Sequence, residues 1–142
     1  MRSLEVDVPE LYTNTSLCCI DDSLSMRTQQ KGARIPALTT TLRNVARIYQ
    51  LARPEGIKDV RFLNSINKAP NIRVGMVKGM MSAHQFRGQT RIGTELKRKV
   101  LKDYVSATMQ KPLLVVTITD GDVSPHAHPH PYPTPCYLPD SS

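Results

Sequence analysis

Leu17-Cys18-Cys19-Ile20-Asp21-Asp22-Ser23 is a short apolar run that ends in two aspartates. A run that is apolar at every position, rather than at every second one, is typical of a strand buried on both faces, as in a parallel sheet. A second run, Leu113-Leu114-Val115-Val116-Thr117-Ile118-Thr119, is apolar and β-branched and leads into Asp120. The sequence therefore predicts two buried strands, each followed directly by an aspartate.

The segments between these two strands alternate in character. After a polar loop over Asp21–Gly32, apolar residues recur at helical spacing from Pro36 to Ala52. The remaining predicted elements are a strand over Val60–Leu63, a helix over Asn71–Met81, a loop over Arg87–Thr90 and a helix over Thr94–Met109. The order strand, helix, strand, helix, helix, strand predicts an α/β domain with parallel strands.

The helix predicted over Thr94–Met109 has two faces. Its apolar face is predicted to comprise Leu96, Val100, Leu101, Tyr104 and Val105. The basic residues assigned to its opposite, solvated face are Lys97, Arg98, Lys99 and Lys102. A basic stripe of this kind could contact phosphates, but no aromatic residues accompany it for stacking on bases, and a solvated face is favoured.

Composition limits the kind of protein. The 142 residues carry 19 basic and 12 acidic side chains, a net charge of +7, which suits one domain with a basic surface. No apolar run approaches the roughly 20 residues of a membrane helix, and the N-terminus lacks the apolar stretch of an export signal. Three cysteines form no disulfide framework, so an intracellular, cytoplasmic location is expected. The predicted organisation is a flexible lead over 1–15, a domain over 16–124 and a disordered His/Pro-rich tail over 125–142.

The acidic strand ends predict a metal site. In an open α/β sheet, ligands bind beyond the carboxyl ends of the strands, so Asp21 and Asp120 are expected to converge if their strands are neighbours. Ser23 and Ser25, at alternate positions of the first loop, add hydroxyl groups. Oxygen ligands with one or two carboxylates suit a hard divalent cation, which is Mg²⁺ first, with Mn²⁺ or Ca²⁺ as alternatives.

Three segments of the chain carry motifs in an order that matches a known family. Ile20-Asp21-Asp22-Ser23-Leu24-Ser25-Met26 is similar to the D-x-S-x-S signature, the metal-ion-dependent adhesion site, of the von Willebrand factor type A domain. The stretch 86–96 resembles the family's Gly-Thr loop and helix, and 115–122 its apolar strand followed by T-D-G. The resemblance covers Leu17–Val123 and implies a Rossmann-like, three-layer fold with a mostly parallel sheet. That sheet is expected to be incomplete on its C-terminal side, because the His/Pro tail stands where the family has further strands.

The resemblance also implies a ligand set and a mode of action. The metal ligands it implies are Asp21, Ser23, Ser25, Thr90 and Asp120. It further implies a Mg²⁺-dependent protein-binding module whose metal takes its last ligand from a carboxylate of a partner protein. An enzyme is not expected from the residues themselves, because every histidine except His84 lies in the tail and none is placed beside a Ser, Cys or Thr nucleophile. The sequence departs from the family at Leu24, where glycine is usual, and at Arg91, which sets a cation beside Thr90.

Two other functions remain open. One is a module that binds nucleic acid or an acidic surface and retains a vestigial metal site. The other is a receiver-like phospho-switch, suggested by the acidic pair at Asp21 and Asp22 but lacking an aspartate after the strand over 60–63. Asp22 itself is predicted to contact a neighbouring strand or loop rather than a metal, and Cys18 and Cys19 are predicted to pack in the core.

Overall fold

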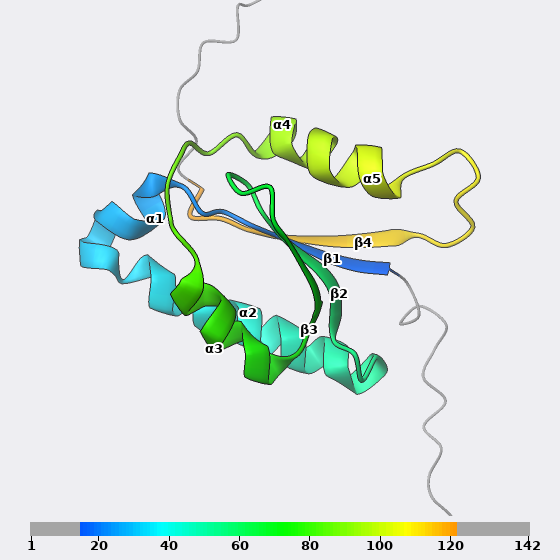
Figure 1. The fold of residues 1–142 in the computed structure, drawn as a ribbon, viewed down its shortest axis with the longest axis horizontal. Helices are drawn as coiled ribbons and strands as arrows, with labels where there is room; N and C mark the ends of the chain where they lie inside the picture. Colours follow the sequence, from blue (N-terminus) through cyan, green and yellow to red (C-terminus); the bar gives the residue numbers. More distant parts are fainter. Residues whose placement is uncertain (1–14, 122–142) are drawn as a thin grey trace, which may run out of the picture.

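The structure, a computed structural model, describes residues 15–121 and shows an open sheet with helices on both faces (Figure 1). The strands lie in the order β3-β2-β1-β4, and β1, β2 and β4 are mutually parallel, whereas β3 is antiparallel to β2. Their bounds are β1 Thr15–Ile20, β2 Ile57–Phe62, β3 Lys68–Ile72 and β4 Leu113–Ile118. The predicted α/β class, with an open, mostly parallel sheet of Rossmann-like character, is confirmed. Apart from Thr15, the predicted lead over 1–15 and tail over 125–142 lie outside the described residues.

Strand β1 is the centre of the sheet and pairs with β2 on one side and β4 on the other. Successive side chains of a strand point to opposite faces. Leu17 and Cys19 accordingly belong to one apolar cluster, whereas Cys18 and Ile20 belong to the other. The continuous apolar run is explained by this position, because both faces of β1 are buried.

Two long helices cover the first face, below the sheet in Figure 1. They are α2 (Arg34–Ala52) and α3 (Val74–Ala83), and they pack on the larger core through residues such as Leu42 and Val77. The helix predicted to start at Asn71 begins later because residues 68–72 form β3, a strand that the sequence reading missed. Pro70 argues against a central strand, but β3 lies at the sheet edge, where proline is tolerated.

One helix covers the other face, as Figure 1 shows above the sheet. It is continuous through α4 (Ile92–Leu96), the π-helical turn η3 (Lys97–Leu101) and α5 (Lys102–Tyr104), so the prediction that it extends to Met109 was wrong. Val100 is buried, but Leu101 is 52% exposed and Val105 47% exposed, which corrects the predicted apolar face. The helix contributes only a narrow stripe because the core beneath it is small.

The segment predicted as a polar loop contains a short helix, α1 (Leu24–Thr28), and the 3₁₀ turn η2 (Gln29–Gly32). Met26 is buried in the larger core and anchors this helical turn, which polarity alone did not indicate. Within residues 15–121, no helix combines the length and the apolar character that crossing a bilayer requires.

Candidate metal site

The carboxyl ends of β1 and β4 lie side by side because the two strands are parallel neighbours. Ile20 pairs with Ile118, and the Asp21 N–H donates to the Ile118 carbonyl at 2.9 Å. Asp21 and Asp120 therefore emerge at the same edge of the sheet, as expected for a ligand site at the strand ends.

Four of the five predicted ligands, Asp21, Ser23, Ser25 and Asp120, form what we call the open cluster. The Ser25 hydroxyl donates to Asp120 Oδ2 at 2.9 Å, and the Ser23 and Ser25 hydroxyl oxygens lie 2.9 Å apart. A hydroxyl has one hydrogen, so Ser23 is the donor to Ser25. Within residues 15–121 no hydrogen bond joins the Asp21 carboxylate to the two hydroxyls, and Asp21 orients the loop instead. One of its oxygens accepts the Ser23 N–H at 2.9 Å and the other the Thr119 hydroxyl at 2.8 Å.

The fifth predicted ligand, Thr90, lies in the adjoining loop. Backbone hydrogen bonds connect that loop to the first one, from Arg87 N–H to the Asp22 carbonyl at 2.7 Å and from Leu24 N–H to the Gly88 carbonyl at 3.1 Å. Thr90 is only 3% exposed, yet among residues 15–121 no hydrogen bond joins it to the open cluster. The structure thus brings four of the five together and places Thr90 in the neighbouring loop.

Gly88 has a backbone φ of +93°, a region that favours glycine. A Cβ at this position would lie 2.4 Å from the Asn64 side-chain oxygen. The loop can therefore approach the end of β2 this closely only with glycine here.

A cation that the sequence reading missed contacts the open cluster. The Arg34 guanidinium, at the start of α2, forms an ion pair with Asp120 Oδ2. Arg91, which was expected to supply the nearby positive charge, is exposed and donates to Gln89 Oε1 at 2.6 and 3.0 Å. Arg34 carries no local motif that could have revealed its role, because its partner lies 86 residues further along the chain.

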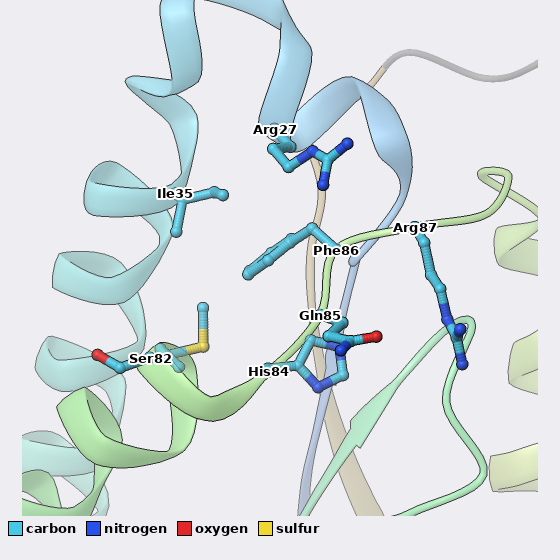
Figure 2. Close-up of a pocket in the computed structure, with 8 residues that line it drawn as sticks. Arg27, Ile35, Ser82, His84, Gln85, Phe86 and Arg87 are labelled. Atoms are coloured by element: carbon cyan, nitrogen blue, oxygen red, sulfur yellow. The ribbon is translucent and has the colours of Figure 1, made fainter.

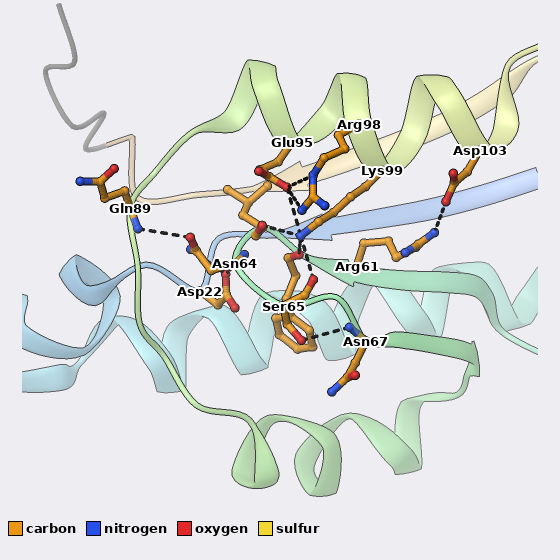
Figure 3. A network of polar contacts seen from close by, with 12 residues as sticks. Asp22, Arg61, Asn64, Ser65, Asn67, Gln89, Glu95, Arg98, Lys99 and Asp103 are labelled. Carbon is orange, nitrogen blue, oxygen red and sulfur yellow. Dashed lines mark hydrogen bonds and ion pairs between the residues drawn. The ribbon is translucent and has the colours of Figure 1, made fainter.

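A second group of polar residues lies at the end of β2, and Figure 3 shows its contacts apart from those of His84. We call it the closed cluster, and its members are Asp22, Asn64, His84, Glu95 and Lys99. Asp22 is 1% exposed, and its Oδ1 accepts the Asn64 backbone N–H at 2.7 Å and the Asn64 amide at 3.0 Å. Its Oδ2 lies 2.8 Å from His84 Nε2, and the His84 ring stacks on Phe62 with centroids 3.5 Å apart. The prediction that Asp22 makes a structural contact is confirmed.

Lys99 completes the closed cluster and corrects the predicted basic stripe. Instead of facing solvent, it is 5% exposed, and its ammonium donates to the carbonyls of Phe62 and Ser65 at 2.7 Å each, and also to that of Leu63. Lys99 is three residues after Leu96 and so shares its helix face. The prediction of a solvated Lys99 was wrong because it rested on the charge of the side chain alone. Backbone carbonyls at the end of β2 provide hydrogen-bond partners that allow its ammonium to be buried.

Glu95 connects Lys99 to the surface. Its Oε2 lies 3.2 Å from Lys99 Nζ and accepts from Arg98 at 2.7 Å. Burial acts to raise the pKa of the Glu95 carboxyl, but the hydrogen bonds from Arg98 and Lys99 outweigh it, and this pKa lies below its ordinary value. Arg98 is therefore engaged with a carboxylate, which leaves Lys97 and Lys102 as the members of the predicted stripe without an ion pair among residues 15–121.

The two adjacent cysteines are buried in β1, as predicted. Burial raises the pKa of the Cys18 thiol to about 12 and that of Cys19 to about 11. Both thiols are therefore protonated at neutral pH, and the thiolate is the reactive form. Their place is in the core.

Within the described part of the chain, no three His, Cys, Asp or Glu side chains gather as a metal-binding group. The open cluster has a different composition, with two hydroxyls and two carboxylates. Comparisons with known protein families, curated proteins and solved structures found no match for this chain.

Proposed function

We propose that the chain is a von Willebrand factor type A-like module that binds a divalent cation, Mg²⁺ first, and through it a carboxylate of a partner protein. The observation that carries the proposal is the hydrogen-bonded series from Ser23 through Ser25 to Asp120, at the adjoining ends of β1 and β4. These residues are spaced through the sequence as the adhesion-site motifs are.

The donor set of the open cluster fits a hard cation. All its side-chain donors are oxygens, and hydroxyls that now bond each other can turn their lone pairs toward a cation. The ion pair between the Arg34 guanidinium and Asp120 also supports a cation site, because it shows this carboxylate in contact with a positively charged group. In the proposed site Ser23, Ser25 and Asp120 hold the cation, Asp21 fixes the loop that carries the serines, and Thr90 completes the set from the adjoining loop.

A bound divalent cation would supply positive charge with an open coordination position, which attracts a carboxylate. Few of the proposed ligands are charged, so the site keeps a net attraction for an acidic group. A net charge of +7 on the chain adds long-range attraction for an acidic partner.

The test is a Mg²⁺ titration of the full chain, followed by thermal unfolding at constant ionic strength. A ligand present at ten times its Kd stabilises the folded state by about 1.4 kcal/mol. We therefore expect the Tm of the unsubstituted chain to rise by about 5 °C or more. Ser25→Ala and Asp21→Asn should abolish this rise, since each removes a proposed ligand or the support of the serine loop.

Glu55→Gln is the matched control for Asp21→Asn. Glu55 is exposed and lies in the turn before β2. Its substitution therefore removes one negative charge, as Asp21→Asn does, but at a position away from the proposed site. The control should respond to Mg²⁺ as the unsubstituted chain does. A Tm that Mg²⁺ leaves unchanged in the unsubstituted chain, or raises equally in all four proteins, would contradict the proposed site.

A further inference from the structure

A groove runs along the surface between α2 and α3, on the face of the sheet that the larger core occupies. It consists of two adjoining hollows, of about 620 Å³ and 360 Å³, that share Ile35, Met81 and Ser82 as lining residues. Figure 2 shows the larger hollow, with Ile35 and Phe86 directed into it and Arg27 above them. We call the two hollows together the α2–α3 groove.

The charges of the α2–α3 groove all have one sign. Arg27 and Arg87 line the larger hollow, Arg43 and Lys78 line the smaller one, and neither is lined by an Asp or a Glu. All four cations are exposed, and none forms an ion pair with another residue of the described range 15–121. Four uncompensated cations along one groove favour an anionic occupant.

The floor of the groove is apolar. Met81 and Phe86 are almost fully buried members of the larger core, and the half-buried Ile35 packs against the same core. A single-stranded nucleic acid bound through its bases would need accessible aromatic faces for stacking, and Phe86 is only 6% exposed. An aliphatic floor between cations instead suits a peptide in which one apolar side chain is flanked by carboxylates.

We propose that the α2–α3 groove binds an acidic segment of a partner protein, with an apolar side chain over the half-buried Ile35 and carboxylates against the arginines. This contact needs no metal, so it goes beyond the function proposed above. Arg27 lies two residues from Ser25 on α1, which allows one acidic partner to reach both sites.

The test measures binding of a fluorescein-labelled peptide, Gly-Glu-Asp-Glu-Leu-Glu-Asp-Glu-Gly, to the full chain by fluorescence anisotropy at low salt. EDTA is present throughout, so that failure of the metal site leaves the result unaffected. We expect saturable binding that weakens with added salt, and weaker binding of a peptide whose Leu is replaced by Gly. Exchanging Arg27 and Arg87 together for Gln should raise the Kd at least about fivefold.

The matched control removes two exposed cations from the opposite side of the sheet, Lys97→Gln with Lys102→Gln, and should leave the Kd unchanged. Ile35→Ser should lower the affinity for the Leu peptide but not for the Gly peptide, which identifies the apolar contact. Equal loss in both charge variants, or no saturable binding, would overturn the proposal. So would tighter, groove-dependent binding of a single-stranded oligonucleotide of equal charge, because the groove would then be a nucleic-acid site.

Discussion

Asp21 and Asp22 are neighbours in the sequence, yet they belong to the open and closed clusters, which differ in kind. In the closed cluster, Asp22 bonds a backbone N–H, a side-chain amide and a stacked histidine ring. In the open cluster, Asp120 bonds a serine hydroxyl and an arginine side chain. Consecutive side chains on an extended backbone point to opposite sides, so a single strand end supplies both clusters.

The difference lies in how freely the partners can move. Backbone groups and a stacked ring are fixed by the fold, so the closed cluster has one arrangement and stabilises the end of β2. Hydroxyls rotate, and a long arginine side chain can move away, so the open cluster can exchange its internal bonds for bonds to a cation. We therefore expect substitutions in the closed cluster to change folding stability, and those in the open cluster to change ion binding.

Lys99→Met is expected to have the largest effect. It keeps the length of the side chain but leaves the carbonyls of Phe62, Leu63 and Ser65 without their shared donor. The free energy of unfolding should fall by about 3 kcal/mol, because each buried unpaired group costs about 1–3 kcal/mol. Urea denaturation measures the change.

Lys97→Met is the control, since Lys97 is exposed on the same helix, and its effect should stay within about 0.5 kcal/mol. Equal stability of the two variants would mean that the closed cluster does not stabilise the fold and would remove the contrast with the open cluster.

Arg34→Gln should have a smaller effect, and this effect is a gain: the affinity of the open cluster for Mg²⁺ should increase. If the open cluster holds a cation, the Arg34 guanidinium competes with it for Asp120. Loss of an ion pair worth about 1 kcal/mol should lower the Kd for Mg²⁺ about fivefold, measured by isothermal titration calorimetry. Arg43→Gln, an exposed change on the same helix, should leave the Kd as it is. A weaker affinity in Arg34→Gln would show that Arg34 supports the site instead.

The smallest expected effect is the pH dependence of the closed cluster. The pKa of Glu95 is lower in the folded chain than its ordinary value of 4.5. Glu95 therefore contributes stability that is complete above that value and is lost as the pH falls through the folded pKa. Glu95→Gln should be less stable than the unsubstituted chain at pH 7, by less than about 1 kcal/mol, and the difference should shrink as the pH falls below 4.5. A difference in unfolding free energy that persists unchanged into acid would contradict this assignment.

The strands of the parallel sheet were predictable because a strand buried on both faces is apolar at nearly every position. The runs around Leu17 and Val115 have this pattern, and their pairing follows from the α/β order. β3 and α1 were missed since each depends on tertiary context. An edge position tolerates Pro70, and a core contact by Met26 stabilises a turn in a polar segment.

The candidate site was predictable to the extent that its residues are local. Ser23 and Ser25 share one loop, and Asp21 and Asp120 follow strands whose ends had to meet. The parts that failed depend on contacts between distant segments. Nothing near Arg34 indicates Asp120 as its partner, and nothing near Lys99 indicates three carbonyls at the end of β2.

The central place of β1 has a consequence for how the chain is made. Ile20 pairs with Ile118, and ribosomes add roughly 5–20 residues per second, so roughly 5 to 20 seconds pass between the synthesis of these partners. Throughout that interval the nascent chain presents one edge of β1 whose backbone N–H and C=O groups lack the neighbouring strand. Slower translation between β1 and β4 should therefore lower the yield of folded protein without changing the stability of the finished molecule.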